Sequence, residues 1–140
     1  THLMAHSMGG IAAALATEEL THIEKLVLIA PATETPRAID NFYQFVPLGN
    51  TVKEAMIEYI IELAQQPLSY FSVVRSVQQH TTPTLWLHDE GDWICPYEDV
   101  LPAQQLQLQH VEFYITKGLG HSKIYRDAKV TKKIIDFMHG

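Results

Sequence analysis

A serine near the start of the chain stands in a pattern that is typical of an activated nucleophile. The stretch "AHSMGG" nearly matches G-x-S-x-G, in which the serine occupies a strained turn between a strand and a helix. Ala5 stands at the position of the first glycine, and Gly9 and Gly10 are the small residues that let strand and helix approach. A helix after Ser7 would bring the backbone N–H of Met8 close to a developing oxyanion. The alternative is that Ser7 only caps a helix that contains glycines.

A serine nucleophile needs a base for its proton, and a histidine base needs a carboxylate that orients it. Two later loops contain such groups. The stretch "LHDEGDWICP" carries Asp89, Glu90 and Asp92, and "GLGHS" carries His121. Both loops follow an expected strand, so we expect them at the sheet edge where Ser7 lies. The chain order is serine, aspartate, histidine, but spacing alone leaves Asp89 and Glu90 as alternatives to Asp92.

Other chemistry is less well supported by the sequence. A metal site is not expected, because no fixed ligand spacing such as H-E-x-x-H joins the nearby candidates His88, Asp89, Asp92 and His121. Cys95 is expected to be a small loop hydrophobe, since it has no evident helix N-terminus or basic partner. The remaining histidines are expected at the surface or in packing, with His6 packed beside the first strand: His2, His6, His22, His80, His110 and His139.

Composition predicts one globular domain. The chain has 140 residues, of which 46% are apolar and 19% charged, and such a balance argues against disorder. A net charge of -6 makes a nucleic-acid partner unexpected, and no apolar run approaches the ~20 residues of a membrane span. Cys95 is the single cysteine, which excludes an internal disulfide. Without a recognisable secretory signal, the sequence predicts a cytoplasmic location.

Apolar runs alternate with helical stretches along the chain. Strands are expected near residues 2–5, 26–30, 85–87 and 111–116, and helices near residues 8–20, 51–67, 69–80, 97–109 and 126–140. The unbroken apolar run at 26–30 suits a parallel strand that is covered on both faces. This order predicts an α/β protein with four parallel strands and right-handed crossovers.

A long helical insertion interrupts this pattern. Residues 33–50 show no clear period and are expected to form loops and short helical pieces. Thr51 and Glu54 have the spacing of a capping box at the start of the next helix. That helix carries one apolar stripe, made of Val52, Met56, Tyr59, Ile60 and Leu63. No period explains three aromatic residues, which are candidates for a substrate pocket or for ordinary packing: Phe42, Tyr43 and Phe45.

These motifs together resemble the C-terminal part of an α/β-hydrolase-fold protein, over nearly the whole chain. "HSMGG" resembles the nucleophile elbow, and "KLVLIAPA" resembles the strand that follows it. "PTLWLHDEGDWICPYED" is similar to the segment whose HD-x-x-D-x-x-V-P pattern carries the triad acid, with Cys95 in place of the valine. "GLGHSKIYRDAKVTKKIIDFM" resembles the loop and last helix that carry the triad histidine.

The resemblance implies a role for each matching residue. Ser7 is the nucleophile, His121 the general base and Asp92, rather than Asp89, the acid that orients it. Met8 supplies one oxyanion N–H. The implied fold is a three-layer αβα sandwich with a mostly parallel sheet. Its core comprises residues 1–35 and 81–140, and residues 36–80 form a helical cap.

A complete member of this fold has about four further strands before the elbow, and the resemblance implies that they are missing here. The second oxyanion donor belongs to that part. The strand before Ser7 is then expected to be a bare edge that pairs with a missing N-terminal segment or with a second copy. We also expect the isolated chain to be poorly active.

The resemblance implies a serine hydrolase that transfers the acyl group of a small-molecule ester or thioester to water, with no cofactor. One alternative is an acyltransferase or C–C bond hydrolase with the same triad. The other is a non-catalytic assembly module that pairs through its open sheet edge. A fold resemblance gives a reaction class and no substrate.

Overall fold

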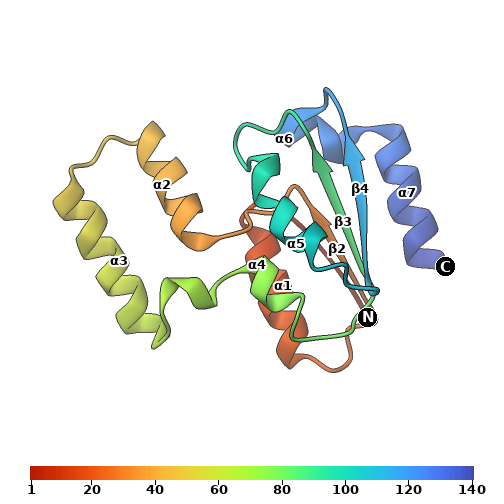
Figure 1. Cartoon of the computed structure of the whole chain (residues 1–140), viewed down its shortest axis with the longest axis horizontal. Coiled ribbons are helices and arrows are strands. Elements are labelled where there is room, and N and C mark those ends of the chain that lie inside the picture. Colours follow the sequence, from red (N-terminus) through yellow and green to blue (C-terminus); the bar gives the residue numbers. More distant parts are fainter.

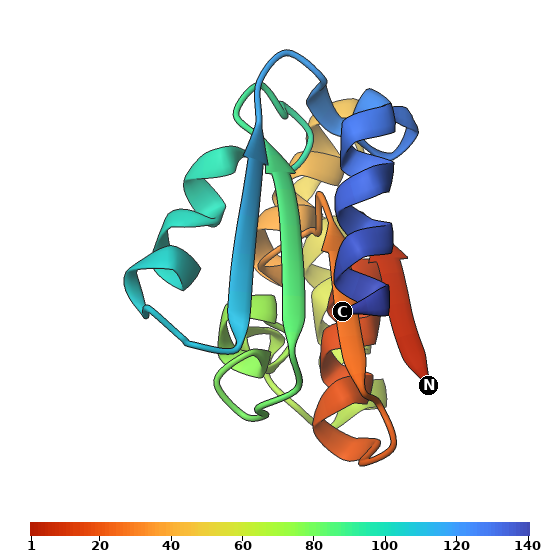
Figure 2. The same cartoon turned by 90° about the vertical axis from the view of Figure 1, so that its right-hand side faces the viewer.

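A four-stranded parallel sheet lies between two layers of helices in the computed structural model, which describes residues 1–140 (Figure 1, Figure 2). The strands follow chain order across the sheet: β1 (His2–His6), β2 (Lys25–Ile29), β3 (Thr84–Asp89) and β4 (Val111–Thr116). The predicted α/β class, the four parallel strands and the order of elements are confirmed.

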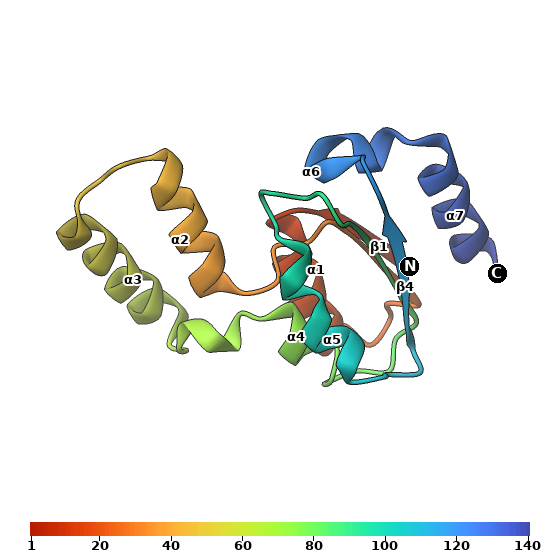
Figure 3. The ribbon, with the colours of Figure 1, turned by 45° about the horizontal axis from the view of Figure 1, so that its top comes forward.

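Each face of the sheet is covered by its own set of helices (Figure 3). One face packs against α1 (Gly9–Glu19), α4 (Val73–Ser76) and α5 (Leu101–Gln105). The other carries α6 (Gly120–Lys123) and α7 (Ala128–His139). Single 3₁₀ turns lie at Leu68–Tyr70, Tyr97–Asp99 and Ile124–Arg126.

The two inner strands are buried on both faces, which explains their unbroken apolar runs. Because side chains alternate along a strand, Leu26 and Leu28 join Trp86 in the core under α1. Val27 and Leu87 face the opposite core, under α7. Both strands are therefore rigid supports for the loops at their carboxyl ends.

Helix α2 (Thr35–Phe45) corrects the prediction of loops and short helical pieces for residues 33–50. Pro36 lies in its first turn, where a missing N–H costs nothing, so the proline starts the helix instead of breaking it. Pro102 takes the same place in the first turn of α5. Pro47 and Gly49 both lie beyond the last residue of α2.

Helix α3 (Asn50–Ala64) was predicted, but the prediction of its N-terminal cap is wrong and that of one continuous apolar stripe is only partly right. Gly49 is the N-cap residue and no side chain caps the helix, so the predicted capping box does not form. Its apolar stripe divides between two environments. Met56 and Ile60 line a cavity, whereas three members of the stripe remain exposed: Val52, Tyr59 and Leu63.

The predicted helix over residues 69–80 is also wrong, because only one 3₁₀ turn and the four residues of α4 form. Ser72 caps α4 by accepting a hydrogen bond from the backbone N–H of Arg75 at 3.0 Å. Ser72 also forms an isolated antiparallel bridge with Glu34, where the chain leaves and re-enters the sheet region. The helices α2 and α3 project from this base to one side of the sheet (Figure 1).

Strand β1 is an edge strand that pairs only with β2. Met4 on this strand is 59% exposed, which is high for a large apolar side chain in a sheet. Its pairing with a further strand or a second copy stays a prediction. None of the helices has both the length and the apolar character that crossing a membrane requires.

Helix α1 approaches the residues after β2 closely at one glycine. A Cβ added to Gly10 would lie 2.5 Å from Cβ of Pro31, which is closer than two carbon atoms can pack. A Cβ added to Gly9 would meet only Cβ of Ala5, at an ordinary 3.7 Å. Of the two glycines expected to let strand and helix approach, Gly10 is the one that the packing requires.

Gly10→Ala should lower the free energy of unfolding by about 1–3 kcal/mol, because the added methyl group overpacks the contact with Pro31. Gly9→Ala is the matched control and should leave stability unchanged or raise it, since alanine favours the helix. Urea unfolding of the two variants and the wild type measures this. Equal stability of the two variants would contradict the packing argument.

Candidate active site

The backbone of Ser7 occupies the left-handed region, with φ at +57°, at the junction of β1 and α1. This conformation is strained for a residue with a side chain, so the surrounding structure must hold it. The Ser7 N–H donates to the carbonyl of Ile29 at 3.1 Å, and the Ser7 carbonyl accepts from Gly10 at 2.9 Å and Ala32 at 3.0 Å. These bonds fix the strand-to-helix turn that the sequence motif predicts.

The structure brings Ser7, His121 and Asp92 into one chain of hydrogen bonds. His121 Nε2 lies 2.9 Å from Ser7 Oγ, and its Nδ1 lies 2.8 Å from Asp92 Oδ2. A carboxylate only accepts, so the imidazole proton is on Nδ1 and Nε2 is free to accept from the serine hydroxyl. His121 lies in α6, a single helical turn where the sequence predicts a loop. The arrangement has the geometry of a nucleophile, a base and an orienting acid.

Asp92 is held by more than its histidine. Its Oδ1 accepts hydrogen bonds from the backbone N–H groups of Ile94 at 2.9 Å and Cys95 at 2.8 Å. The side chains of Asp92 and His121 are both buried, so water cannot compete for these bonds. The carboxylate therefore has one oxygen fixed by its own loop and the other available to His121.

The two other acidic candidates do not contact His121. Asp89 Oδ1 accepts from the N–H of Gly91 at 2.9 Å, and its Oδ2 accepts from Thr116 Oγ1 at 2.6 Å and from Leu119 N–H at 3.0 Å. Asp89 therefore anchors the loop between β4 and α6 that carries His121. Glu90 is exposed and pairs with Lys117.

These hydrogen bonds control the ionisation of Asp89. Burial alone would raise its pKa, but the bonds from Thr116 and from the backbone N–H groups of Leu119, Gly120 and Gly91 outweigh that effect. The pKa of Asp89 therefore lies below its usual range. A carboxyl group of lowered pKa stabilises the fold above its unfolded pKa and loses that contribution as the pH falls through the folded pKa.

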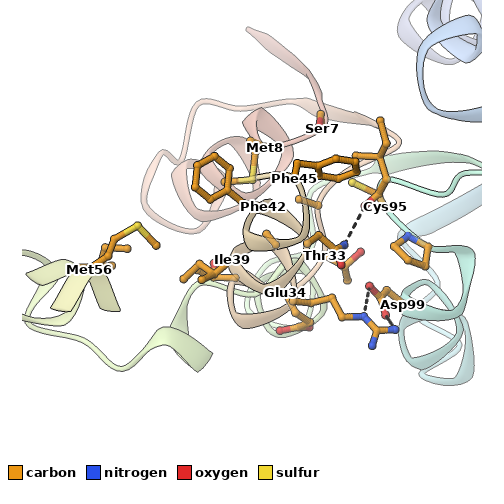
Figure 4. A pocket seen from close by; sticks show the side chains of 18 residues that line it. Ser7, Met8, Thr33, Glu34, Ile39, Phe42, Phe45, Met56, Cys95 and Asp99 are labelled. Carbon is orange, nitrogen blue, oxygen red and sulfur yellow. Dashed lines mark hydrogen bonds and ion pairs between the residues drawn. The ribbon is translucent and has the colours of Figure 1, made fainter. Parts of the chain in front are cut away.

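The backbone N–H of Met8 donates to no protein acceptor. Met8 is the N-cap residue of α1, and its side chain lies at the cavity beside Ser7 (Figure 4). An unpaired N–H at the start of a helix, next to the serine hydroxyl, can donate a hydrogen bond to a negative charge that develops there.

His6 has a contact that the sequence does not indicate. Its Nε2 lies 3.0 Å from the carbonyl oxygen of His121, and the two imidazole rings are 4.7 Å apart. Because the carbonyl only accepts, His6 donates and ties β1 to α6. The prediction of simple packing for His6 missed this bond, and no local pattern marks it.

Cys95 is buried and lines the same cavity as Ser7. Burial and the nearby charge of Asp92 raise the pKa of its thiol to about 12. The thiol therefore stays protonated, as a small loop hydrophobe would. Nowhere in the structure do three or more histidine, cysteine or acidic side chains group in a way that could hold a metal ion.

A cavity of about 500 Å³ opens beside Ser7, between α2, α3 and the loop that carries Asp92 (Figure 4). Its lining is mainly apolar and includes five residues of these two helices: Ile39, Phe42, Phe45, Met56 and Ile60. The expectation of pocket aromatics needs one correction. Tyr43 does not line the cavity, since it packs against Phe42 and its hydroxyl lies 3.7 Å from Met56 Sδ.

Helix α2 is joined by polar contacts to the segment between Asp92 and Asp99. The Arg37 guanidinium forms two bonds to the Asp99 carboxylate, at 2.8 and 3.1 Å. Asn41 Nδ2 donates to the carbonyl of Ile94 at 3.0 Å. Both contacts therefore join a helix that lines the cavity to the segment that follows Asp92.

Asp89→Asn should lower the free energy of unfolding at pH 7 by about 1–3 kcal/mol, because the amide nitrogen cannot accept from Thr116 or Leu119. The difference from the wild type should begin to shrink as the pH falls below about 4, where Asp89 protonates in the unfolded chain, and should be lost as the pH falls through the lower folded pKa of Asp89. Urea unfolding at several pH values measures both effects. A difference that is independent of pH would contradict this account of Asp89.

Comparison with known proteins gives matches in structure alone: no family pattern and no curated protein matches the sequence. An esterase from Pyrococcus furiosus aligns with 99% of this chain, with a TM-score of 0.71 and 14% identity. An α/β-hydrolase from a Medee basin deep-sea metagenome aligns with the whole chain, with a TM-score of 0.68 and 20% identity. The meta-cleavage product hydrolase of Pseudomonas fluorescens aligns with 99% of the chain, with a TM-score of 0.63 and 15% identity.

The chain spans 52, 65 and 64% of the lengths of these three proteins. At such low identity the likeness concerns the fold, and it agrees with the parallel sheet and the helical layers described above. The chain therefore has the fold of a part of the α/β-hydrolases.

Proposed function

We propose that this chain carries the catalytic residues of a serine hydrolase that acts on a carboxylic ester or thioester by acyl transfer. The observation that carries the proposal is the chain of hydrogen bonds from the buried Asp92 through His121 to Ser7, which ends at a mainly apolar cavity. A helix-capping serine has no need of a buried histidine and aspartate in this order.

In the acylation step, Ser7 Oγ attacks the substrate carbonyl carbon while His121 Nε2 takes the hydroxyl proton. The carbonyl double bond opens and its electron pair moves to the oxygen. The Met8 N–H donates to that oxyanion. Asp92 accepts from Nδ1 throughout, so it stabilises the imidazolium that forms and keeps the ring oriented.

The tetrahedral intermediate then collapses. The bond between the carbonyl carbon and the leaving oxygen or sulfur breaks, and His121 Nε2 gives its proton to that leaving atom. An acyl group remains on Ser7 Oγ. Water attacks this ester with His121 again as the base, and collapse of the second intermediate returns the proton to Ser7. No metal or redox cofactor takes part in any step of this proposal.

The cavity favours an apolar acyl group. Phe42, Phe45 and Met56 present aromatic and flexible apolar surface within the space next to Ser7. The Pyrococcus furiosus neighbour is an esterase, which agrees with this substrate class. A C–C bond hydrolase with the same residues is the second candidate, because another neighbour is a meta-cleavage product hydrolase.

Ser7→Ala should abolish hydrolysis of p-nitrophenyl esters, and Asp92→Asn should lower kcat roughly 10³–10⁴-fold by favouring the wrong imidazole tautomer. The matched controls are Ser122→Ala and Glu90→Gln, which remove the same groups at exposed neighbouring positions. Both controls should stay within twofold of the wild type. Full activity of Asp92→Asn would exclude Asp92 as the orienting acid.

Phe42→Ala should weaken hydrolysis of medium-chain esters more than that of acetate esters, because the substitution removes apolar contact with the acyl chain. Leu48→Ala is the matched control, since Leu48 is 48% exposed, like Phe42 at 49%, but does not line the cavity. The quantity to measure is kcat/KM as a function of acyl length. An equal loss at every chain length would show that the acyl chain does not reach Phe42.

A further inference from the structure

His88 is a wholly buried histidine that no step of the proposed mechanism uses. It lies on β3, four residues before Asp92. Strand β3 is an interior strand of the sheet, between β2 and β4 (Figure 2). Its Nε2 lies 2.7 Å from the carbonyl oxygen of Cys95, and its Nδ1 is buried without a hydrogen-bond partner. Because the carbonyl only accepts, the proton of His88 is on Nε2 and Nδ1 is bare.

An unpartnered buried nitrogen carries a cost in folding free energy that an apolar side chain of similar size would avoid. Simple filling of the core therefore does not explain a histidine at this position. The bond from Nε2 to the Cys95 carbonyl is what His88 provides and phenylalanine does not. The role of His88 must then be sought in what that carbonyl does.

Cys95 connects His88 to the acid of the site. The Cys95 N–H donates to Asp92 Oδ1 at 2.8 Å, while its carbonyl accepts from His88. Cys95 therefore accepts a hydrogen bond from a residue of β3 through its carbonyl and donates one to Asp92 through its amide. Asp92 Oδ2 itself lies 3.7 Å from His88 Nε2, which is too far for a hydrogen bond.

His88 remains neutral in this environment. Burial lowers its pKa, and a charge on His121 acts in the same direction, whereas the bond to the Cys95 carbonyl and the charges of Asp92 and Asp99 act against both. Protonation would also add an Nδ1–H where no acceptor lies. The ring is therefore a fixed donor to the loop, held by a strand that is buried along its whole length.

We propose that His88 is a positioning residue, which holds the Cys95 carbonyl and thereby keeps the Asp92 carboxylate aimed at Nδ1 of His121. The inference rests on the proposed function for its catalytic consequence. Its structural part, the dependence of the His121–Asp92 bond on His88, stands independently of that function.

The test compares His88→Phe, which keeps an aromatic ring and removes the donor, with His88→Gln, whose amide nitrogen replaces Nε2. The first measurement is the Nδ1–H proton of His121 in the NMR spectrum of the whole chain. We expect its downfield resonance in the wild type and in His88→Gln, and its loss or broadening in His88→Phe. An unchanged resonance in a folded His88→Phe variant would overturn the proposal.

The second measurement is the pH profile of kcat for a p-nitrophenyl ester. His88→Phe should lower the plateau about 10–100-fold and move the acidic limb to lower pH, because a displaced Asp92 no longer stabilises protonated His121. His88→Gln should have the plateau and the acidic limb of the wild type. Val130→Ala, a truncation in the opposite core, controls for lost stability and should leave the acidic limb in place.

The outcomes separate this proposal from the proposed function. Should the wild type show no ester hydrolysis while the His121 resonance still depends on His88, the positioning role holds and the hydrolase function fails. A normal plateau and an unshifted limb in His88→Phe would assign His88 to core packing alone. If His88→Phe does not fold, His88→Met takes its place in both measurements.

Discussion

The hydrogen bond from His121 Nδ1–H to Asp92 determines which nitrogen of the imidazole is protonated, and the other contacts of the site depend on this tautomer. With Nδ1 protonated, Nε2 faces the Ser7 hydroxyl as an acceptor. The surrounding contacts maintain this bond from both sides. Asp89 and His6 hold the segment that carries His121, and the Ile94 and Cys95 amides hold the carboxylate.

The fold places these groups because parallel strands deliver their loops to one edge of the sheet. Ser7 follows β1, the Asp92 loop follows β3, and His121 follows β4. The helices α2 and α3 add the apolar wall of the cavity next to the serine. Since α2 also contacts the segment that follows Asp92, the cavity and the Asp92 carboxylate share one structural support.

Much of this arrangement was predictable from local patterns, and the rest depends on contacts between distant residues. The apolar runs of β2 and β3 and the glycines after Ser7 identified the strands and the turn. The sequence spacing could not distinguish Asp89 from Asp92, because the backbone conformation of the loop after β3 determines which carboxylate reaches His121. Pro36 concealed α2, since a proline reads equally as a helix breaker and as a helix start. No pattern marked the bonds of His6 or His88, which span 115 and seven residues.

The central claim is that Ser7 is an activated nucleophile, and covalent labelling tests it most directly. A fluorophosphonate probe phosphonylates an activated serine without any need for turnover, and peptide mass mapping locates the adduct. We expect one adduct on Ser7, in the 140-residue chain or in a longer polypeptide that contains it, and a much slower reaction in His121→Ala. Absence of an adduct from both, or an adduct on another serine, would contradict the account and favour a non-catalytic role.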